Sequence, residues 1–476
     1  MTLISIFSFS LAGVFYLLLH TIVTIHILLF KEDTKSAIGW IGLVWLAPII
    51  GTIVYILLGI NRIHRKALSL GREKSNIKKG EILPAELTAS LSPNALQFLN
   101  LGYQVHPQPF VLGNTARAFE NGDEAYPEMC RLIRNAKKEV LLQSYIFNND
   151  YAGQEFVRAL QQASENGVHS KVLVDGIGLN YSSPTIAEAL KEIKNLEFAV
   201  FLPSKKPINL PFVNLRNHRK ILVVDRQQAI FGGMNISAGN LLRMHPQEPI
   251  QDVTFQIAGP VVQQIVNVFE EDWSFTTHQK LSAYLPDTNG PTHHTGAARI
   301  VPDGPDSNYG KIAFMFTGAL ACAQKSVQII TPYFLPEEDM LCALEVAAMR
   351  GVRIEILLPQ KSNIFGMDRA MRANFMRLLK RNIKIYRTPS PFDHSKILLV
   401  DYEWAFIGSA NWDVRSLKLN FECNMEFIDK NLAAQLENIF TRKKQKAHLQ
   451  SADALARQPW HQKLLDNTFK LLTPYY

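Results

Sequence analysis

Cysteine is scarce in this sequence, and the four cysteines stand far apart. They form no C-x-x-C pair: Cys130, Cys322, Cys342 and Cys423. This scatter gives no metal-site spacing and is typical of reduced, mostly buried thiols in a cytoplasmic setting. No cluster of Asp, Glu or His has the spacing of metal ligands either. We therefore expect chemistry that needs no metal and no other cofactor.

Charged residues are missing from two long runs at the N-terminus. Leu3–Phe30 contains no Asp, Glu, Lys or Arg, and neither does Ala37–Ile60. Each run is long enough to cross roughly 30 Å of hydrocarbon as a helix. A cleaved signal peptide is the alternative for the first run, but that run lacks a basic leading region and a second span follows it. The sequence predicts a transmembrane hairpin over residues 1–60, with Pro48 and Gly51 marking a bend.

A basic cluster follows the second run. It holds one acidic residue, Glu73, among seven cations: Arg62, Arg65, Lys66, Arg72, Lys74, Lys78 and Lys79. Because basic flanks of a span stay in the cytoplasm, both termini and the chain that follows the second run are predicted to be cytoplasmic. The cluster either sets this topology alone or also holds anionic head groups, at about 1 kcal/mol per cation. The formal charge of +8 fits an anionic partner, either lipid or nucleic acid.

The remainder of the chain repeats itself. Val140–Phe147 (VLLQSYIF) matches Val327–Phe334 (VQIITPYF), and each is followed by a helical pattern, a Gly-Val pair and a buried strand. The two buried strands are His169–Asp175 and Arg353–Pro359. Strand–helix–strand units of this kind build parallel sheets covered by helices. The sequence therefore predicts an α/β fold of two similar halves.

The domain boundaries follow from composition. Asp287–Gly296 is a Pro, Gly and polar stretch that cannot sustain a helix or strand. We expect a basic juxtamembrane linker at 61–115, a first half at 116–286 and a second half at 287–476.

Each half carries one copy of a polar signature. It reads His-x-Lys, four residues, Asp, six residues, Gly-small-x-Asn. The copies are His218, Lys220, Asp225 and Asn235, then His394, Lys396, Asp401 and Asn411. One such His-x-Lys-x4-Asp pattern arises by chance at roughly one position in 10⁴, but two with the same downstream Gly-x-x-Asn indicate a duplicated catalytic site.

The signature suits attack on a phosphodiester. In a strand, residues i and i+2 share a face, so each His projects with its Lys. An imidazole can attack phosphorus or move a proton, while Lys and Asn hold the non-bridging oxygens. Because each half supplies one His and one Lys, we expect the site where the two halves meet.

A longer set of motifs carries a family resemblance. With the duplicated signature, Asn411–Glu422 (NWDVRSLKLNFE), Gly259-Pro260, Asp272-Trp273 and the apolar double segment resemble the bacterial cardiolipin synthases of the phospholipase D superfamily. The resemblance covers nearly the whole chain. It implies an inner-membrane phosphatidyltransferase that joins two phosphatidylglycerols and releases glycerol through a phosphohistidine. The multi-Asp metal motif of the other type of cardiolipin-making enzyme is absent.

The resemblance also implies roles for single residues. His218 is the expected nucleophile and His394 the acid and base, and Asp252 and Glu422 are the expected carboxylates that orient them. Asp225 and Asp401 complete the signature as structural residues at the end of its strand. Arg415 and Ser416 either touch the substrate or tie a helix start to the site.

Two other functions stay open at this point. A membrane-bound phospholipase D would hydrolyse the same intermediate to phosphatidic acid. A phosphodiester nuclease would explain the basic charge but not the two apolar spans. We expect lipid partners, phosphatidylglycerol and cardiolipin, and no nucleic acid.

Overall fold

The computed structural model describes residues 3–31, 33–59, 92–203, 215–281 and 296–473. The chain divides into two compact units, residues 1–66 and 67–476. The basic cluster after Ile60 and the predicted boundary at Asp287–Gly296, except Gly296 itself, lie outside the described residues.

The N-terminal unit is helical and apolar. Helix α1 (Leu3–Phe30) includes Gly13–Phe30, and it is the one helix among the described residues that is long and apolar enough to cross a membrane. Asp33 then caps α2 (Thr34–Leu46) by accepting a hydrogen bond of 2.6 Å from the Ser36 amide.

The second apolar run differs from one continuous helix. Helix α2 ends at Leu46, α3 (Pro48–Val54) begins after Ala47, and a π-helical turn covers Tyr55–Gly59. The predicted break at Pro48 is present because proline lacks the amide that a continuing helix needs. Gly51 allows α3 to approach α2, since a Cβ there would lie 2.3 Å from the Leu43 carbonyl oxygen.

The second unit is built on one β-sheet. Within the described residues, this sheet has sixteen strands. The first half contributes, from the middle outwards, β1 (Val111–Glu120), β9 (Val253–Ala258), β7 (Gln228–Gly232), β6 (Lys220–Val224), β2 (Glu139–Ser144), β3 (His169–Asp175) and β4 (Leu196–Phe201). The second half contributes β10 (Gly296–Asp303), β19 (Asn420–Ile428), β17 (Trp404–Gly408), β16 (Ile397–Val400), β11 (Ser326–Ile330), β13 (Arg353–Pro359) and β14 (Lys384–Thr388), with β20 (His448–Leu449) at the edge. Apart from β20 the two orders correspond strand for strand, as expected of a duplicated fold.

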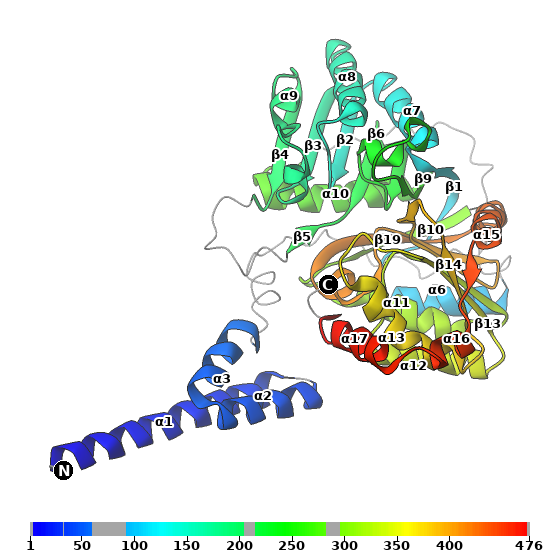
Figure 1. Cartoon of the computed structure of the whole chain (residues 1–476). Helices are drawn as coiled ribbons and strands as arrows, with labels where there is room; N and C mark the ends of the chain where they lie inside the picture. Colours follow the sequence, from blue (N-terminus) through cyan, green and yellow to red (C-terminus); the bar gives the residue numbers. More distant parts are fainter. Residues whose placement is uncertain (1–2, 32, 60–91, 204–214, 282–295, 474–476) are drawn as a thin grey trace. The chain divides into compact units, whose positions relative to one another are not determined.

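Helices cover the sheet in each half. In the first half α7 (Asn121–Arg134), α8 (Tyr151–Glu165) and α9 (Ala187–Lys191) share a hydrophobic core with alternate residues of β2, β3 and β6. Figure 1 shows α8 and α9 lying along these strands. In the second half α11 (Lys311–Cys322), α12 (Glu338–Met349) and α13 (Met367–Leu379) make the equivalent core. The other long helices of the halves are α10 (Val261–Thr277) and α15 (Lys430–Gln445).

The predicted strand–helix–strand units are present in both halves. Strand β2 pairs parallel with β3 across α8, and β11 pairs parallel with β13 across α12. The signature strands β6 and β16 lie outside these parallel units, and each runs antiparallel to its neighbours. A tight hairpin joins β6 to β7 and β16 to β17, and such a hairpin reverses the chain.

Part of the predicted linker belongs to the catalytic unit. Helix α6 (Pro93–Val105) packs into the core of the second half, where Phe98 stacks on Trp404 with ring centroids 5.1 Å apart. Asn94 donates a hydrogen bond of 2.7 Å to Asp401. The chain therefore enters the folded unit through the second half before it builds the first.

Two short crossing strands tie the halves together. Strand β5 (Arg216–Asn217) pairs with β19 of the second half, and β15 (Phe392–Asp393) pairs with β8 (Ile250–Gln251) of the first. Each crossing strand ends immediately before a signature histidine. The chain just before each signature histidine is therefore paired with a strand of the opposite half.

Candidate active site

The two signature histidines face each other. Their ring centroids lie 6.5 Å apart with an angle of 79° between the rings. The amide of His218 donates to the Phe421 carbonyl at 2.9 Å, and that of His394 donates to the Gln251 carbonyl at 2.7 Å. Backbone bonds to the opposite half thus fix both histidines.

Each imidazole contacts a carboxylate from the opposite half. His218 Nδ1 lies 3.0 Å from Glu422 Oε1, and His394 Nδ1 lies 2.8 Å from Asp252 Oδ2. A carboxylate at Nδ1 favours a proton there and leaves the lone pair on Nε2. The two histidines and the two carboxylates that the sequence predicted for the site therefore lie together. Each histidine pairs with the carboxylate of the opposite half.

Glu422 accepts hydrogen bonds from three further side chains. The donors are Ser409 Oγ at 2.5 Å, Ser416 Oγ at 3.0 Å and Asn420 Nδ2 at 3.1 Å. Burial raises the pKa of Glu422 to about 7, against the opposing effects of Lys220 and these hydrogen bonds. The Asp252 side chain has a simpler environment: within the described residues it accepts, besides its contact with His394, a hydrogen bond of 2.8 Å from the Val253 amide.

The signature lysines lie beside the histidines. Lys220 Nζ donates to the His218 carbonyl at 2.6 Å, and Lys396 Nζ donates to the His394 carbonyl. Burial lowers the pKa of Lys396 to about 8 and lowers the pKa of Lys220 in the same direction.

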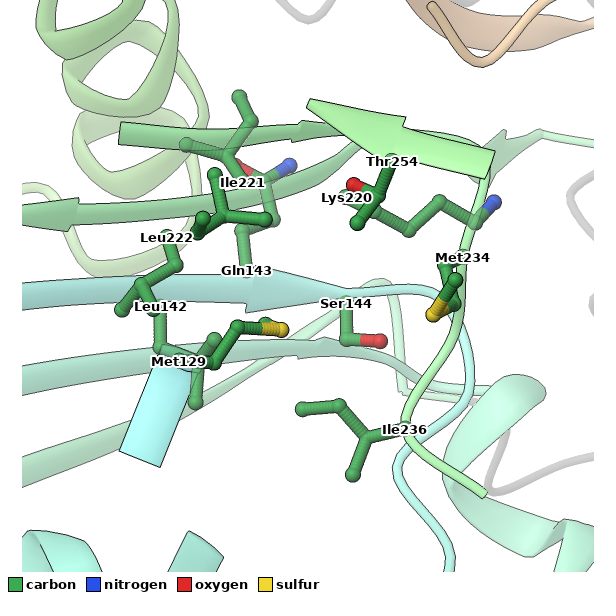
Figure 2. A pocket seen from close by; sticks show the side chains of 11 residues that line it. Met129, Leu142, Gln143, Ser144, Lys220, Ile221, Leu222, Met234, Ile236 and Thr254 are labelled. Carbon is green, nitrogen blue, oxygen red and sulfur yellow. The ribbon is translucent and has the colours of Figure 1, made fainter. Parts of the chain in front are cut away.

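Small cavities border both lysine stems. Figure 2 shows Lys220 beside Thr254 and Met234, with its nitrogen at the end of the cavity away from Leu142 and Leu222. The equivalent cavity in the second half is lined by Lys396 and by aromatic and aliphatic side chains, including Phe406 and Trp412. This apolar packing is the physical reason for the lowered pKa values.

Both imidazoles are neutral at pH 7. Burial, followed by the nearby Lys396, lowers the pKa of His394 to about 4 despite the Asp252 carboxylate. Burial and Lys220 lower the pKa of His218 in the same direction. A neutral imidazole with a free lone pair is the form that can act as a nucleophile or a base.

The signature aspartates do not join this group. Asp225 accepts hydrogen bonds from the amides of residues 137–139, and Asp401 accepts them from the amides of residues 324–326. Each follows its signature strand and lies five residues after the signature lysine, which is roughly 16 Å of extended chain at ~3.3 Å per residue. Both residues have positive φ, 51° and 54°, in the hairpin turn. Their contacts are those of turn residues.

The two predicted phosphate-binding asparagines have different surroundings. Asn411 Nδ2 donates to Ser416 Oγ at 3.1 Å, and its buried Oδ1 has no hydrogen-bond partner within the described residues. Asn235 Oδ1 instead accepts from the Ile146 amide at 3.2 Å. Ser416 ties a helix start to the site, because its amide bonds the Asp413 side chain at 2.8 Å.

Sequence reasoning missed two aromatic residues and a serine at this site. The ring centroids of Tyr145 and His218 lie 5.1 Å apart, and those of Tyr333 and His394 lie 6.4 Å apart. A signal was present, because both matched strands of the repeat end in a segment that contains a tyrosine. Ser409 counted only as a small residue of the signature, yet it binds Glu422.

Within the described residues, no group of three His, Cys, Asp or Glu side chains is placed to hold a metal ion.

Comparisons with known proteins cover most of the chain. Residues 129–273 and 317–444 match the family described as "Cardiolipin synthase, PLD-like domain". Residues 18–59 match the family described as "Phospholipase_D-nuclease N-terminal".

Full-length relatives agree with the family match. The chain is 29% identical over 464 residues to a cardiolipin synthase of Halalkalibacterium halodurans, covering 95% of this chain and 92% of that protein. It is 32% identical over 418 residues to cardiolipin synthase 1 of Bacillus cereus, covering 84% and 82% of the two chains. The crystal structure of phosphatidylserine synthase from Haemophilus influenzae has the same fold, with a TM-score of 0.64 at 18% identity over 81% of this chain and all of that one.

The ionisable groups predict pH-dependent anion binding. As pH rises from 6 to 9, Glu422 gains a negative charge near pH 7 and Lys396 loses its positive charge near pH 8. Both changes disfavour an anion, so the affinity for sulfate, whose own charge is constant in this range, should fall steadily. Lys396→Gln should weaken sulfate binding about tenfold at pH 7, since a charged hydrogen bond contributes ~1.5 kcal/mol or more. The substitution should also remove the fall in sulfate affinity near pH 8. Titration calorimetry on the detergent-solubilised protein measures this, with the exposed Lys463→Gln as control. Equal affinity at pH 6 and pH 9 would contradict the assignment.

Proposed function

The chain belongs to the cardiolipin synthase family with phospholipase D-like domains, and on that premise we propose that it transfers a phosphatidyl group between two phosphatidylglycerol molecules. The products are cardiolipin and glycerol. The observation that carries the proposal is the pair of imidazoles whose ring centroids lie 6.5 Å apart. Each imidazole contacts a carboxylate of the opposite half. A phosphodiester that enters between them meets a nucleophile on one side and a proton donor on the other.

The first step forms a covalent intermediate. His218 Nε2 attacks phosphorus, the bond from phosphorus to the glycerol oxygen breaks, and His394 donates a proton to that oxygen. The entering anionic phosphodiester and Asp252 favour the protonated form of His394, which without substrate is neutral at pH 7. Glycerol leaves, and phosphatidyl remains on His218.

The second step reverses the roles. Neutral His394 takes a proton from a hydroxyl of the second phosphatidylglycerol, whose oxygen attacks phosphorus. The bond from phosphorus to His218 breaks, and cardiolipin is released. Because one phosphodiester replaces another, the overall reaction is close to reversible.

The lysines and asparagines hold the phosphate. Lys220 and Lys396 each bond the carbonyl of their own signature histidine and stabilise the non-bridging oxygens as charge builds up on them. Asn411 is suited to the same task, because its buried amide bonds Ser416, which in turn bonds the Glu422 carboxylate beside His218. Asn235 would act similarly in the first half.

The membrane segment decides where this chemistry occurs. We infer that α1 and the second apolar run form a hairpin in a bacterial inner membrane and that the catalytic unit is cytoplasmic. The support is the uncharged sequence of both runs and the excess of basic residues after Ile60. A reporter fused after Tyr476 tests the orientation, and periplasmic activity of a phosphatase reporter would overturn it.

The acceptor separates a synthase from a hydrolase. A catalytic unit held at the lipid surface has a high effective concentration of lipid alcohol, so transfer should prevail over hydrolysis. With phosphatidylglycerol as the sole lipid, we expect cardiolipin and glycerol in near-equal amounts, and excess glycerol should convert cardiolipin back. Lipid mass spectrometry with an enzymatic glycerol assay measures both products. Phosphatidic acid as the main product would instead identify a membrane-bound phospholipase D.

A further inference from the structure

Helix α17 (Trp460–Lys470) presents its apolar side chains outwards. Trp460 is 76% exposed, Leu464 is 59% exposed, and Leu471, directly after the helix, is 77% exposed. Positions i, i+4 and i+11 lie on one side of a helix and form a single stripe. An ordinary surface helix would turn such a stripe towards the core.

The acidic residue of α17 points inwards instead. Asp466 is buried and bonds Arg372 Nε at 2.8 Å on α13, with Arg369 Nη1 at 3.4 Å. Figure 1 shows α17 lying alongside α13. The helix is thus attached through this charged contact and through Phe469, which packs against the core, while its apolar stripe stays exposed. Exposed apolar groups of this size mark an interaction surface.

The charges around the stripe indicate the partner. The charged residues from Arg457 to Lys470 are Arg457, Lys463, Asp466 and Lys470. Since Asp466 is buried, every exposed Asp, Glu, Lys or Arg side chain of this segment is positive. An apolar stripe with Trp and Leu between cations is typical of a helix that lies in the interface of an anionic bilayer.

The inward side of α17 is connected to the candidate site. Phe365, which is 86% exposed, contacts Phe469 of α17 with ring centroids 5.5 Å apart. Two residues earlier in the same loop, Asn363 accepts a hydrogen bond of 2.7 Å from the Tyr333 hydroxyl. The Tyr333 ring in turn lies 6.4 Å from His394.

We propose that Trp460, Leu464 and Leu471, here named the α17 ridge, insert into the surface of an anionic bilayer beside the active site. The ridge holds the second half against the leaflet, so that lipid reaches His394 without crossing water. This inference rests on the proposed function for its substrate, phosphatidylglycerol, which is itself an anionic lipid.

Spin labels on the full-length protein test the ridge. One nitroxide is attached through Leu464→Cys on the stripe and another, as the matched control, through Gln462→Cys on a different side of the same helix. Both are made after Cys322→Ser and Cys342→Ser, and the proteins are reconstituted in phosphatidylglycerol-containing vesicles. Power-saturation spectroscopy compares access by oxygen, which concentrates in lipid, with access by a water-soluble nickel chelate.

The ridge predicts opposite results at the two positions. The label at 464 should be reached at least several-fold better by oxygen than by the chelate, and the label at 462 should show the reverse. Equal chelate access at both positions would overturn the proposal, and so would dipolar coupling between labels at 464, which would show that a second copy covers the stripe. Because this readout does not use activity, a lipid-embedded label in a protein that makes no cardiolipin would leave the ridge standing and refute the synthase function.

Discussion

Each signature histidine is held by a carboxylate from the other half, and the rest of the candidate site depends on that exchange. His218 is paired with Glu422 and His394 with Asp252. In both cases the residue before the histidine belongs to a short strand that crosses to the opposite half. Neither half has an oriented imidazole without its partner. Burial of the histidines and lysines lowers their pKa values.

The halves share a strand order but not their side chains. Behind the first histidine, buried Arg219 on the signature segment bonds Asp272 of α10 at 2.9 Å. Behind the second, the acid is on the signature segment and the base on the helix, in the 2.6 Å pair of Asp393 and Lys443. Loss of one partner of such a buried pair costs about 3–5 kcal/mol. Together with the larger hydrogen-bond network of Glu422, this reversal gives the two histidines different surroundings.

The sequence predicted the parts of the site that local spacing determines. The alternation of a strand places His218 with Lys220, and the repeat places strands at 169–175 and 353–359. It could not predict contacts that depend on long-range folding, such as the bond from Ser409 to Glu422. Helix α6 was hidden because residues 61–115 read as basic linker, although Phe98 packs in the second core. The broken second apolar run reflects a local rule, the missing amide of Pro48.

The most direct test of the two-histidine account uses phosphatidyl-p-nitrophenol, whose leaving group needs no protonation. The His394→Ala variant should release about one nitrophenolate per protein in a burst and then stall, since no base activates the acceptor. Mass spectrometry should locate phosphatidyl on the peptide that contains His218. His218→Ala should give no burst, while the exposed His169→Ala should turn over normally. A burst in His218→Ala with phosphatidyl on His394 would contradict the assignment of the nucleophile, and continuous turnover in either active-site variant would contradict the covalent mechanism.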